Sequence, residues 1–389
     1  MKLKGAFFSV LIFVGLCLNA QQTAVPVFTS GIDEYNTYRI PAVIQTPAGI
    51  LLAFAEGRVH SADDFGNIDL VLKRSFDQGA TWSTMSVVVD SKNLQAGNPA
   101  PVVDLTDPRF PKGRIFLFYN TGNNSESEVR KGNGCREVWY KTSIDEGVSW
   151  SEPTNITLQV HYPYQPKFNQ AYNSKKDWRS YANTPGHAMQ FEQLPYKGRI
   201  YVAANHSQGD ISSTNIDYFS HGFYSDDHGA TFKLAQSVPL AGSNESSAAE
   251  LSNGSLMLNC RNQKGDVQNR IIALSHDGGE KWDKVYFDSN LPDPICQGAI
   301  LTVGFVKGKA TLAFANNADQ KDRNNLTLRL SADEGATWTQ SYLIDKNPAR
   351  NEADFTAYAD LVKLNKRNIG VLYEKADYSF IVFKSVNLK

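Results

Sequence analysis

The chain has 389 residues, with 39 lysines and arginines against 40 aspartates and glutamates and a formal net charge of −1. This balance gives no reason to expect nucleic acid or an anionic membrane surface as a partner. The length suits two average domains or one large all-β domain.

The N-terminus has the pattern of a secretory signal peptide. Lys2 and Lys4 precede an apolar run from Ala6 to Leu18, which suits a signal-peptide core and is too short to span a bilayer. We expect cleavage after Ala20, so that residues 1–20 are removed. Residues 21–389 then form one mature domain with 37 basic and 40 acidic residues, a net charge of −3.

The cysteines bear on location and on cross-links. Cys17 offers a site for lipid attachment, although Leu16 before it is large for a lipoprotein signal. We therefore expect an exported protein, periplasmic or secreted, with lipid anchoring as the alternative. Cys135, Cys260 and Cys296 remain in the mature chain. This odd and sparse set makes no disulfide framework and leaves room for one bridge.

One short motif occurs five times. The copies are "SFDQGATW" at 75, "SIDEGVSW" at 143, "SDDHGATF" at 225, "SHDGGEKW" at 275 and "SADEGATW" at 331. The aspartate can accept hydrogen bonds from the backbone of its own turn, the glycine supplies a positive φ, and the aromatic ring can pack beneath the hairpin. We interpret these Asp boxes as structural, because five equivalent catalytic centres would serve no purpose.

Strand-like runs accompany the boxes. "IDLVLKRS", "REVWYKTS", "RIIALS" and "LTLRLS" run into the first, second, fourth and fifth boxes, and each reads as a β-strand entering a turn. Further runs such as "RIFLFYN" and "SLMLNCR" lie between boxes, and no amphipathic helix longer than two turns is indicated. A recurring unit of this kind predicts an all-β propeller of four-stranded blades.

Charged residues at the ends of apolar strands are the candidates for chemistry. In chain order they are Arg39 in "TYRIPAVI", Arg58 followed by Asp63 and Asp64, Glu245 and Arg261 sixteen residues apart, Arg323, and Tyr358 and Glu374, again sixteen apart. A lone arginine at a strand end is normally a solvated cap. A propeller, however, brings the inner strands of distant repeats to one axis, and several guanidiniums gathered there would suit a carboxylate.

Taken together, these motifs resemble a bacterial exo-α-sialidase (neuraminidase) of glycoside hydrolase family 33, whose fold is a six-bladed β-propeller. The resemblance covers nearly the whole mature chain. It rests on "YRIP" at 38–41, the five Asp boxes, the Glu245–Arg261 pair, and the Tyr358–Glu374 pair ending in "GVLYE". It implies a retaining hydrolase for terminal α-linked sialic acids of glycoproteins, glycolipids and oligosaccharides.

The resemblance also implies a role for each residue. Arg39, Arg261 and Arg323 would bind the sialic acid carboxylate, and Glu374 would brace Arg39. Tyr358 would be the nucleophile, with Glu245 as its general base. Arg58 would lie near the 4-position of the sugar, and an aspartate after it would be the acid/base, Asp64 rather than Asp63. Arg329 is the alternative to Arg323, although it lies inside the strand that enters the fifth box.

The chemistry is consistent with these residue types. Sialic acid carries a carboxylate on its anomeric carbon, so a neutral phenol approaches more easily than a carboxylate nucleophile, and tyrosine-using sialidases are a known exception among glycosidases. The phenol needs a base to take its proton. We expect the acid/base aspartate to be partly buried, with a raised pKa.

Other features remain open. "TPGHAMQ" at 184–190 is either a rim segment that meets the substrate or a turn with a satisfied histidine. The loop at 161–178 either shapes leaving-group specificity or covers one blade. The seven histidines show no metal-ligand spacing, so neither metal nor cofactor is expected. We expect a monomer acting on sialylated glycans. A trans-sialidase of the same fold and a sialoglycan-binding propeller without activity are the rival interpretations.

Overall fold

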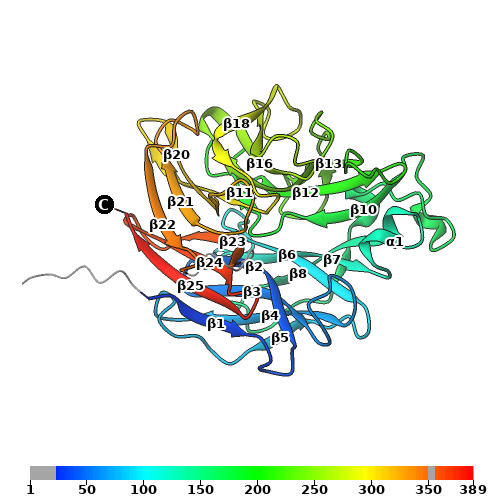
Figure 1. Ribbon diagram of the computed structural model, residues 1–389, viewed down its shortest axis with the longest axis horizontal. Helices are drawn as coiled ribbons and strands as arrows, with labels where there is room; N and C mark the ends of the chain where they lie inside the picture. Colours follow the sequence, from blue (N-terminus) through cyan, green and yellow to red (C-terminus); the bar gives the residue numbers. More distant parts are fainter. Residues whose placement is uncertain (1–22, 349–354, 389) are drawn as a thin grey trace, which may run out of the picture.

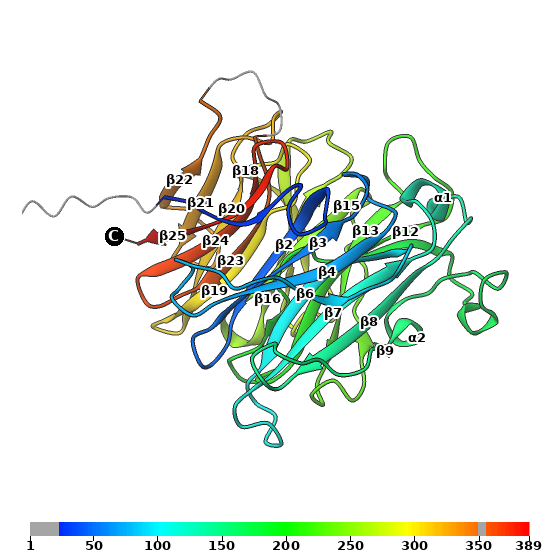
Figure 2. The same cartoon turned by 90° about the horizontal axis from the view of Figure 1, so that it is seen from below.

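The computed structural model describes residues 23–348 and 355–388. The predicted signal peptide at 1–20, with Cys17, lies outside the described residues. Strands dominate the described chain, and no helix in it is both long and apolar enough to cross a membrane. The helices are α1 (Glu126–Arg130) and α2 (Thr157–Val160), with single 3-10 turns at Gln170–Tyr172 and Ser252–Gly254. Figure 2 shows both α-helices at the periphery of the strands.

Four sheets have four or five strands each. The first contains β1 (Val25–Thr29), β25 (Phe380–Asn387), β24 (Asn368–Lys375) and β23 (Thr356–Lys363), in that order. The second contains β10 (Trp178–Asn183), β12 (Ile200–Gln208), β13 (Tyr218–Ser225) and β14 (Lys233–Leu234), with β11 (Met189–Gln190) also on β12. The third runs in order through β15 (Ser243–Glu250), β16 (Leu256–Asn262), β17 (Asn269–Ser275) and β18 (Lys284–Pro292). The fourth runs through β19 (Ala299–Val306), β20 (Lys309–Asn317), β21 (Leu326–Ser331) and β22 (Gln340–Asp345).

The fifth sheet has eight strands. They are β2 (Thr37–Gln45), β3 (Leu51–Arg58), β4 (Ile68–Ser75), β5 (Ser86–Val89), β6 (Gln95–Asp104), β7 (Arg114–Gly122), β8 (Arg136–Ser143) and β9 (Thr154–Asn155). Strands β4 and β6 pair in parallel at one position, Ile68 with Gln95. All other neighbours in this sheet pair antiparallel.

The sheets are arranged around a common centre (Figure 1), so the prediction of an all-β propeller is confirmed. In the described chain the expected six blades do not appear as six separate hydrogen-bonded sheets. The described residues form five sheets, because the bridge between Ile68 and Gln95 joins the strands on either side of it into one. Strands β2, β6, β12, β15, β19 and β23 contact one another in turn, and β23 contacts β2 again.

The two ends of the described chain close the ring. β1 pairs antiparallel with β25, with Val25 opposite Phe383. Figure 1 shows these first and last strands side by side, blue against red. Pairing of the N-terminal strand with the C-terminal hairpin satisfies backbone groups that would otherwise form an open sheet edge.

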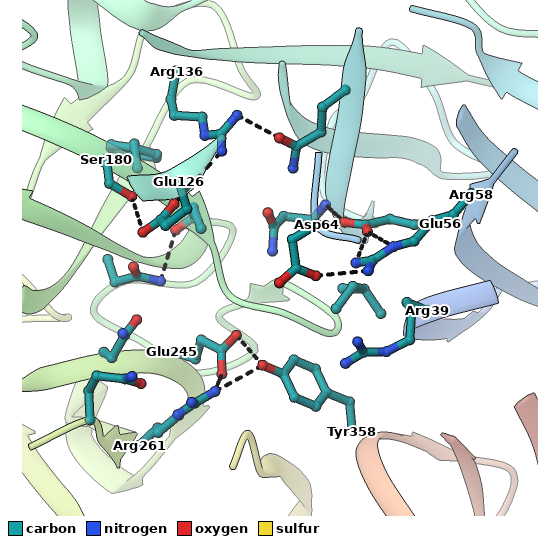
Figure 3. A pocket seen from close by; sticks show the side chains of 18 of the residues that line it. Arg39, Glu56, Arg58, Asp64, Glu126, Arg136, Ser180, Glu245, Arg261 and Tyr358 are labelled. Carbon is teal, nitrogen blue, oxygen red and sulfur yellow. Dashed lines mark hydrogen bonds and ion pairs between the residues drawn. The ribbon is translucent and has the colours of Figure 1, made fainter. Parts of the chain in front are cut away.

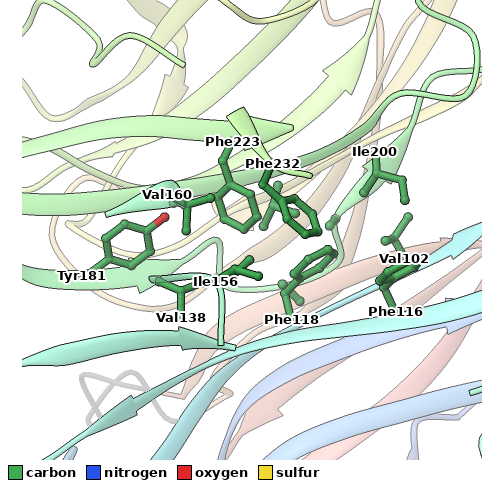
Figure 4. Close-up of a cluster of buried hydrophobic side chains, with 14 of the residues drawn as sticks. Val102, Phe116, Phe118, Val138, Ile156, Val160, Tyr181, Ile200, Phe223 and Phe232 are labelled. Carbon is green, nitrogen blue, oxygen red and sulfur yellow. The ribbon is translucent and has the colours of Figure 1, made fainter. Parts of the chain in front are cut away.

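Apolar side chains fill the space between neighbouring sheets. β3, with the sequence LLAFAEGR, is buried along its whole length, whereas half of the residues of β5 and of β22 are exposed. Figure 4 shows the cluster between β7 and β13, where Phe118 meets Phe223 and Phe232 edge-on at 5.6 Å between ring centroids. Buried aromatic pairs of this geometry add to the area they remove from water. Continuous apolar runs are therefore expected in strands covered on both faces.

The Asp boxes are turns, as predicted. In the first box, Asp77 accepts from the Thr81 amide at 2.9 Å and the Thr81 hydroxyl at 2.6 Å, while the Ser75 hydroxyl accepts from the Gly79 amide at 2.8 Å. These hydrogen bonds lower the pKa of Asp77 to about 2. The same bonds to the box serine and aspartate recur in the boxes at 143, 225 and 331, and the box at 275 keeps those to the backbone. The aspartates are engaged in holding hairpins.

Each box glycine also lies against the part of the ring that precedes it. A Cβ on Gly79 would lie 2.2 Å from Phe383 of β25, so only glycine fits. Three other box glycines also meet side chains of the preceding strands closely, since a Cβ would lie 2.6 Å from Phe116 at Gly229, 2.4 Å from Tyr201 at Gly279 and 2.6 Å from Met257 at Gly335. Gly147 has more room, with Leu72 at 3.2 Å. The boxes thus brace neighbouring units as well as their own hairpins.

All three described cysteines, Cys135, Cys260 and Cys296, are buried and free. The one disulfide that the sequence left room for is not formed.

Candidate active site

A polar pocket of about 260 Å³ gathers side chains from distant parts of the chain. It lies at the ends of strands from β2 to β23, and its volume is slightly below the usual range for small-molecule sites. The residues that line it are Arg39, Ile40, Glu56, Arg58, Asp64, Gln95, Asn98, Glu126, Arg136, Ser180, Tyr181, Ala182, Asn205, Asn244, Glu245, Arg261, Gln263, Arg323 and Tyr358. Seven of the eight predicted site residues are among them. The eighth, Glu374, lies directly behind.

Tyr358, Glu245 and Arg261 form one hydrogen-bonded group (Figure 3). The Tyr358 hydroxyl donates to Glu245 Oε1 at 2.6 Å, and Arg261 Nη1 donates to the same hydroxyl at 2.9 Å. Arg261 Nη1 also reaches Glu245 Oε2 at 2.7 Å. Burial, and then the charge of Glu245, raise the pKa of the Tyr358 phenol well above its ordinary value. The phenol is therefore neutral, with a carboxylate positioned to take its proton.

Glu374 holds Arg39 and the backbone of the tyrosine strand. Arg39 Nε donates to Glu374 Oε1 at 2.7 Å, and the other oxygen accepts from the Tyr358 amide at 3.0 Å. Glu374 is fully buried. The neighbouring Tyr373 points to the opposite face of β24 and packs into the core. Arg39 Cζ lies 5.3 Å from the centre of the Tyr358 ring, so Glu374 holds the guanidinium and the phenol side by side.

Of the two candidate arginines after residue 320, Arg323 lines the pocket and Arg329 does not. Arg323 Cζ lies 5.8 Å from the Tyr358 ring centre, and its Nη1 donates to the Tyr378 hydroxyl at 3.2 Å. Arg329 donates to Asn316 at 2.9 Å within its own sheet. The structure thus brings Arg39, Arg261 and Arg323 around one phenol.

Asp64, and not Asp63, lies in the pocket. Asp64 Oδ1 is 2.8 Å from Arg58 Nη1, whereas Asp63 bonds to Ser61 at 2.9 Å and does not line the cavity. The buried Arg58 also binds Glu56, with Nη2 at 2.7 Å from Glu56 Oε2. Arg58 is thus shared between one buried and one exposed carboxylate.

The expected raised pKa of the acid/base aspartate is wrong for this state of the site. Partial loss of water around the carboxylate at the pocket acts to raise the pKa of Asp64, but the charges of Arg58 and Arg39 and the hydrogen bond from Arg58 outweigh it, so the pKa is lowered. The Asp64 side chain is 77% exposed, so its contact with Arg58 faces solvent on the Asp64 side.

Several residues in the pocket or beside it carry no role in the sequence-based prediction. Glu56 lies two residues before Arg58 in the sequence, but no motif there predicts a function for it. Tyr378, whose ring centre lies 3.9 Å from Arg39 Cζ, sits in the hairpin after β24 and carries no sequence signal. Glu126 and Arg136 come from α1 and the start of β8. Their spacing of ten residues matches no motif.

The segment at 184–190 contains a satisfied histidine. His187 is buried, its Nδ1 lies 2.6 Å from Asp360 Oδ1, and its amide donates to Asp360 Oδ2 at 2.9 Å. The same oxygen accepts from the Val43 amide at 2.8 Å. The carboxylate of Asp360 raises the pKa of His187 against the lowering effect of burial. No residue of this segment lines the pocket, and His187 is held by Asp360 of β23, which also binds Val43 of β2.

The loop at 161–178 covers β8 and β9. Its Tyr172 hydroxyl donates to Glu137 Oε1 at 2.7 Å and accepts from Asn155 at 3.0 Å. None of its residues lines the pocket. Of the two interpretations of this loop, the covering role is the one its contacts support.

Asp104, Asp107 and His228 bring oxygen and nitrogen atoms within 4.8 Å of one another, the only such group among the described residues. They lie outside the pocket. Asp107 Oδ2 is held by Arg109 at 2.8 Å and Arg114 at 3.1 Å, and Asp104 Oδ2 lies 2.9 Å from His228. These contacts make the group an ion-paired network.

Comparison with known proteins agrees with this geometry. The family model described as "BNR repeat-like domain" matches residues 49–381. A sialidase of Micromonospora viridifaciens is 29% identical over 89% of this chain and 51% of its own length. A sialidase of Bacteroides fragilis (strain YCH46) is 27% identical over 94% of this chain and 64% of its own. The chain thus spans between half and two thirds of the length of these relatives.

A solved structure shares the fold. The structure titled "Hadza microbial sialidase Hz136" superposes with a TM-score of 0.77 and 26% identity, over 94% of this chain and 69% of that one. The resemblance to sialidases that the motifs predict is confirmed, and the chain belongs to the BNR repeat-like domain family.

Proposed function

We propose that the protein is an exo-α-sialidase that removes terminal α-linked sialic acids from glycoproteins, glycolipids and oligosaccharides with retention of configuration. One observation carries the proposal: three arginines, a tyrosine bonded to a glutamate, and an aspartate from six segments of the chain face one pocket. The names of the relatives point to the same activity.

The arginines suit the acidic sugar. Arg39, Arg261 and Arg323 would bind the carboxylate on the anomeric carbon, since planar guanidiniums match carboxylates with paired hydrogen bonds. Arg39 is neutralised by Glu374 and Arg261 by Glu245, which allows these charges to lie close together in the free site. Bound in this way, the anomeric carbon would lie above the Tyr358 hydroxyl.

Tyr358 would be the nucleophile. Its oxygen forms a bond to the anomeric carbon while the bond to the leaving oxygen breaks. Glu245 takes the phenolic proton, and Asp64 gives a proton to the leaving oxygen. In the second step Asp64 takes a proton from water, whose oxygen displaces the tyrosine, and Glu245 returns its proton to Tyr358. Two displacements at one carbon give retention.

Asp64 must be protonated for the first step, and its lowered pKa in the free site opposes this. Separation from Arg58 would remove the effect that stabilises the ionised form. Arg58 would keep Glu56 as its partner at 2.7 Å, so no buried guanidinium would be left without a counter-charge. We propose that the bound sugar, with its 4-position near Arg58, makes this separation.

We further propose that the propeller has six blades, with the eight-stranded sheet counted as two. One bridge between Ile68 and Gln95 is the sole parallel pairing that joins its halves. The cycle of contacts through β2, β6, β12, β15, β19 and β23 supports a six-fold count. So does the order in which each box glycine meets the preceding strands.

The remaining proposals rest on the sequence. Residues 1–20 would direct export to the periplasm or the medium, with lipid attachment at Cys17 as the alternative. Sialylated glycans would be the partners, the protein would act as a monomer, and the residues proposed above complete the reaction without metal or cofactor.

A fluorogenic α-sialoside tests the activity, with Tyr358→Phe beside the wild type. The proposal predicts release of the fluorophore by the wild type and not by the variant. Binding without release by either protein would favour the sialoglycan-binding interpretation. Nuclear magnetic resonance of the first-released sugar distinguishes a hydrolase from a trans-sialidase. Release of α-sialic acid supports retaining hydrolysis, whereas a 2,7-anhydro product or transfer to an added acceptor supports a trans-sialidase.

A further inference from the structure

The wall of the pocket that faces the three arginines is itself charged, and the mechanism above does not use it. Figure 3 shows Arg136, Glu126 and Ser180 on the side opposite Arg261 and Tyr358. These residues come from β8, α1 and β10. No box motif and no strand-end pattern accounts for them.

Arg136 is built into this wall. Its side chain is 4% exposed, and its Nη1 donates to Gln95 at 2.5 Å. A Cβ on Gly122 would lie 1.6 Å from Arg136 Nη1, so the guanidinium occupies space that only glycine at position 122 leaves open. Burial lowers the pKa of Arg136. An arginine has five N–H donors, of which Gln95 takes one, and Arg136 lines the cavity.

Glu126 faces Arg136 across a gap. Its Oε1 accepts from the Ser180 hydroxyl at 2.7 Å and from the Tyr218 hydroxyl at 2.7 Å, which fixes the carboxylate. Its Oε2 lies 3.8 Å from Arg136 Nη2, too far for a direct hydrogen bond. A group between them must accept from the guanidinium and donate to the carboxylate. A hydroxyl does both, and a methyl group does neither.

The shape of the sugar decides which hydroxyl this is. In the six-membered ring of a sialic acid, C5 lies opposite C2, the carbon that carries the carboxylate. If the carboxylate binds the arginines and C4 lies beside Arg58, as proposed above, the substituent on C5 would point to the wall of Arg136 and Glu126. That substituent is an acetamide, a glycolylamide ending in a hydroxyl, or a hydroxyl itself.

We propose that Arg136 and Glu126 bind a hydroxyl on the C5 substituent and so make the site selective for sialic acids that carry one, N-glycolyl or deaminated, over the N-acetyl form. This inference rests on the proposed function, since it uses the placement of the carboxylate. Loss of a hydrogen bond to a charged group, with the buried Arg136 left without that partner, predicts a preference of about ten- to a hundredfold in kcat/KM.

Three 4-methylumbelliferyl α-glycosides test the proposal: those of N-acetylneuraminic acid, N-glycolylneuraminic acid and the deaminated sugar with a C5 hydroxyl. The wild type should cleave one or both of the hydroxylated substrates about tenfold or more faster, in kcat/KM, than the N-acetyl substrate. Comparison of the N-glycolyl substrate with the deaminated substrate shows whether a long or a short C5 substituent places its hydroxyl between Arg136 and Glu126.

Two variants locate the preference. Glu126→Gln keeps the size of this half-exposed side chain but replaces the carboxylate oxygen that would accept from the hydroxyl with an amide nitrogen. Arg136→Gln removes the guanidinium that would donate to the hydroxyl. Each should bring the three kcat/KM values together, mainly by slowing the hydroxylated substrates. Arg199→Gln is the matched control, because Arg199 is also 4% exposed and ion-paired but lies outside the pocket. It should keep the wild-type ratio.

The outcomes are distinct. Cleavage of all three substrates by the wild type with equal kcat/KM, or a faster reaction of the N-acetyl form, overturns this inference and leaves the proposed function standing. An unchanged preference in a folded Glu126→Gln also overturns it, even if Arg136→Gln fails to fold. Cleavage of none of the three overturns the proposed function and this inference with it.

Discussion

The Tyr358 hydroxyl donates to Glu245 Oε1 at 2.6 Å, although the two residues lie 113 positions apart in the chain. One comes from β23 and the other from β15, in different sheets of the ring. The contact pairs a neutral phenol with a carboxylate, and the pKa of the phenol is raised well above 10. Proton transfer to Glu245 is therefore the condition for Tyr358 to act as a nucleophile.

Glu245→Gln should lower kcat by about 10²- to 10⁴-fold, because an amide cannot take the phenolic proton. Steady-state kinetics with a fluorogenic sialoside measure the effect. Glu128→Gln, at an exposed glutamate paired with Lys131, is the control and should leave kcat unchanged. Equal rates for Glu245→Gln and the wild type would remove the general base from the mechanism.

Arg323→Lys and Arg329→Lys form a matched pair. Lysine keeps the charge but loses the planar fork, so Arg323→Lys should reduce kcat/KM by about tenfold or more. Arg329 donates to Asn316 away from the pocket, and its replacement should leave kcat/KM as in the wild type. A loss of kcat/KM in Arg329→Lys, with wild-type kcat/KM in Arg323→Lys, would assign substrate binding to Arg329 instead of Arg323.

The dependence of kcat/KM on pH reports Asp64 in the free protein. The pKa of Asp64 is lowered below 3.8, so the protonated form that gives the first proton becomes more populated as the pH falls. We expect kcat/KM to rise as the pH decreases from about 7 to about 5, with circular dichroism showing that the fold persists. Asp64→Asn should be slow and lose this rise.

Asp63→Asn is the control for that experiment, because the Asp63 carboxylate bonds to Ser61 outside the pocket. It should keep the wild-type profile. A flat profile in Asp63→Asn and a normal one in Asp64→Asn would move the acid/base role to the other aspartate.

Gly79→Ala and Gly49→Ala separate two effects in the ring. Both glycines have positive φ, +90° and +83°, so alanine at either site should cost about 1 to 2 kcal/mol of unfolding free energy. Only at Gly79 would the new Cβ also meet Phe383, at 2.2 Å. Urea unfolding should therefore show a clearly larger loss for Gly79→Ala, and equal losses would contradict the bracing role of the box.

Much of the fold could be predicted because its signals are local. "IDLVLKRS", "REVWYKTS" and "LTLRLS" coincide with β4, β8 and β21 as observed. The boxes predicted their own turns, since each aspartate bonds within five residues of itself. The bridge from Ile68 to Gln95 could not be predicted, because it depends on how two neighbouring units meet rather than on either sequence.

The candidate site, too, contains residues that the sequence predicts and residues that it does not. Arg39, Glu245, Arg261 and Tyr358 carry family motifs, and the structure brings them into one pocket. The lowered pKa of Asp64 depends on its distance from Arg58, which sequence spacing does not give. Arg136 and Glu126 depend on a glycine that admits the guanidinium and on a helix of five residues. Neither has a recognisable pattern.

A mechanism-based inactivator tests the central claim most directly. A 2,3-difluoro sialic acid loses the fluoride on C2 to the attacking group, and the fluorine on C3 slows release of the covalent product. After incubation and proteolysis, mass spectrometry should find the sialyl group on the peptide that contains Tyr358, and Tyr358→Phe should remain unlabelled. Labelling of Glu245 or Asp64 instead, or rapid turnover of natural sialosides by Tyr358→Phe, would contradict the account.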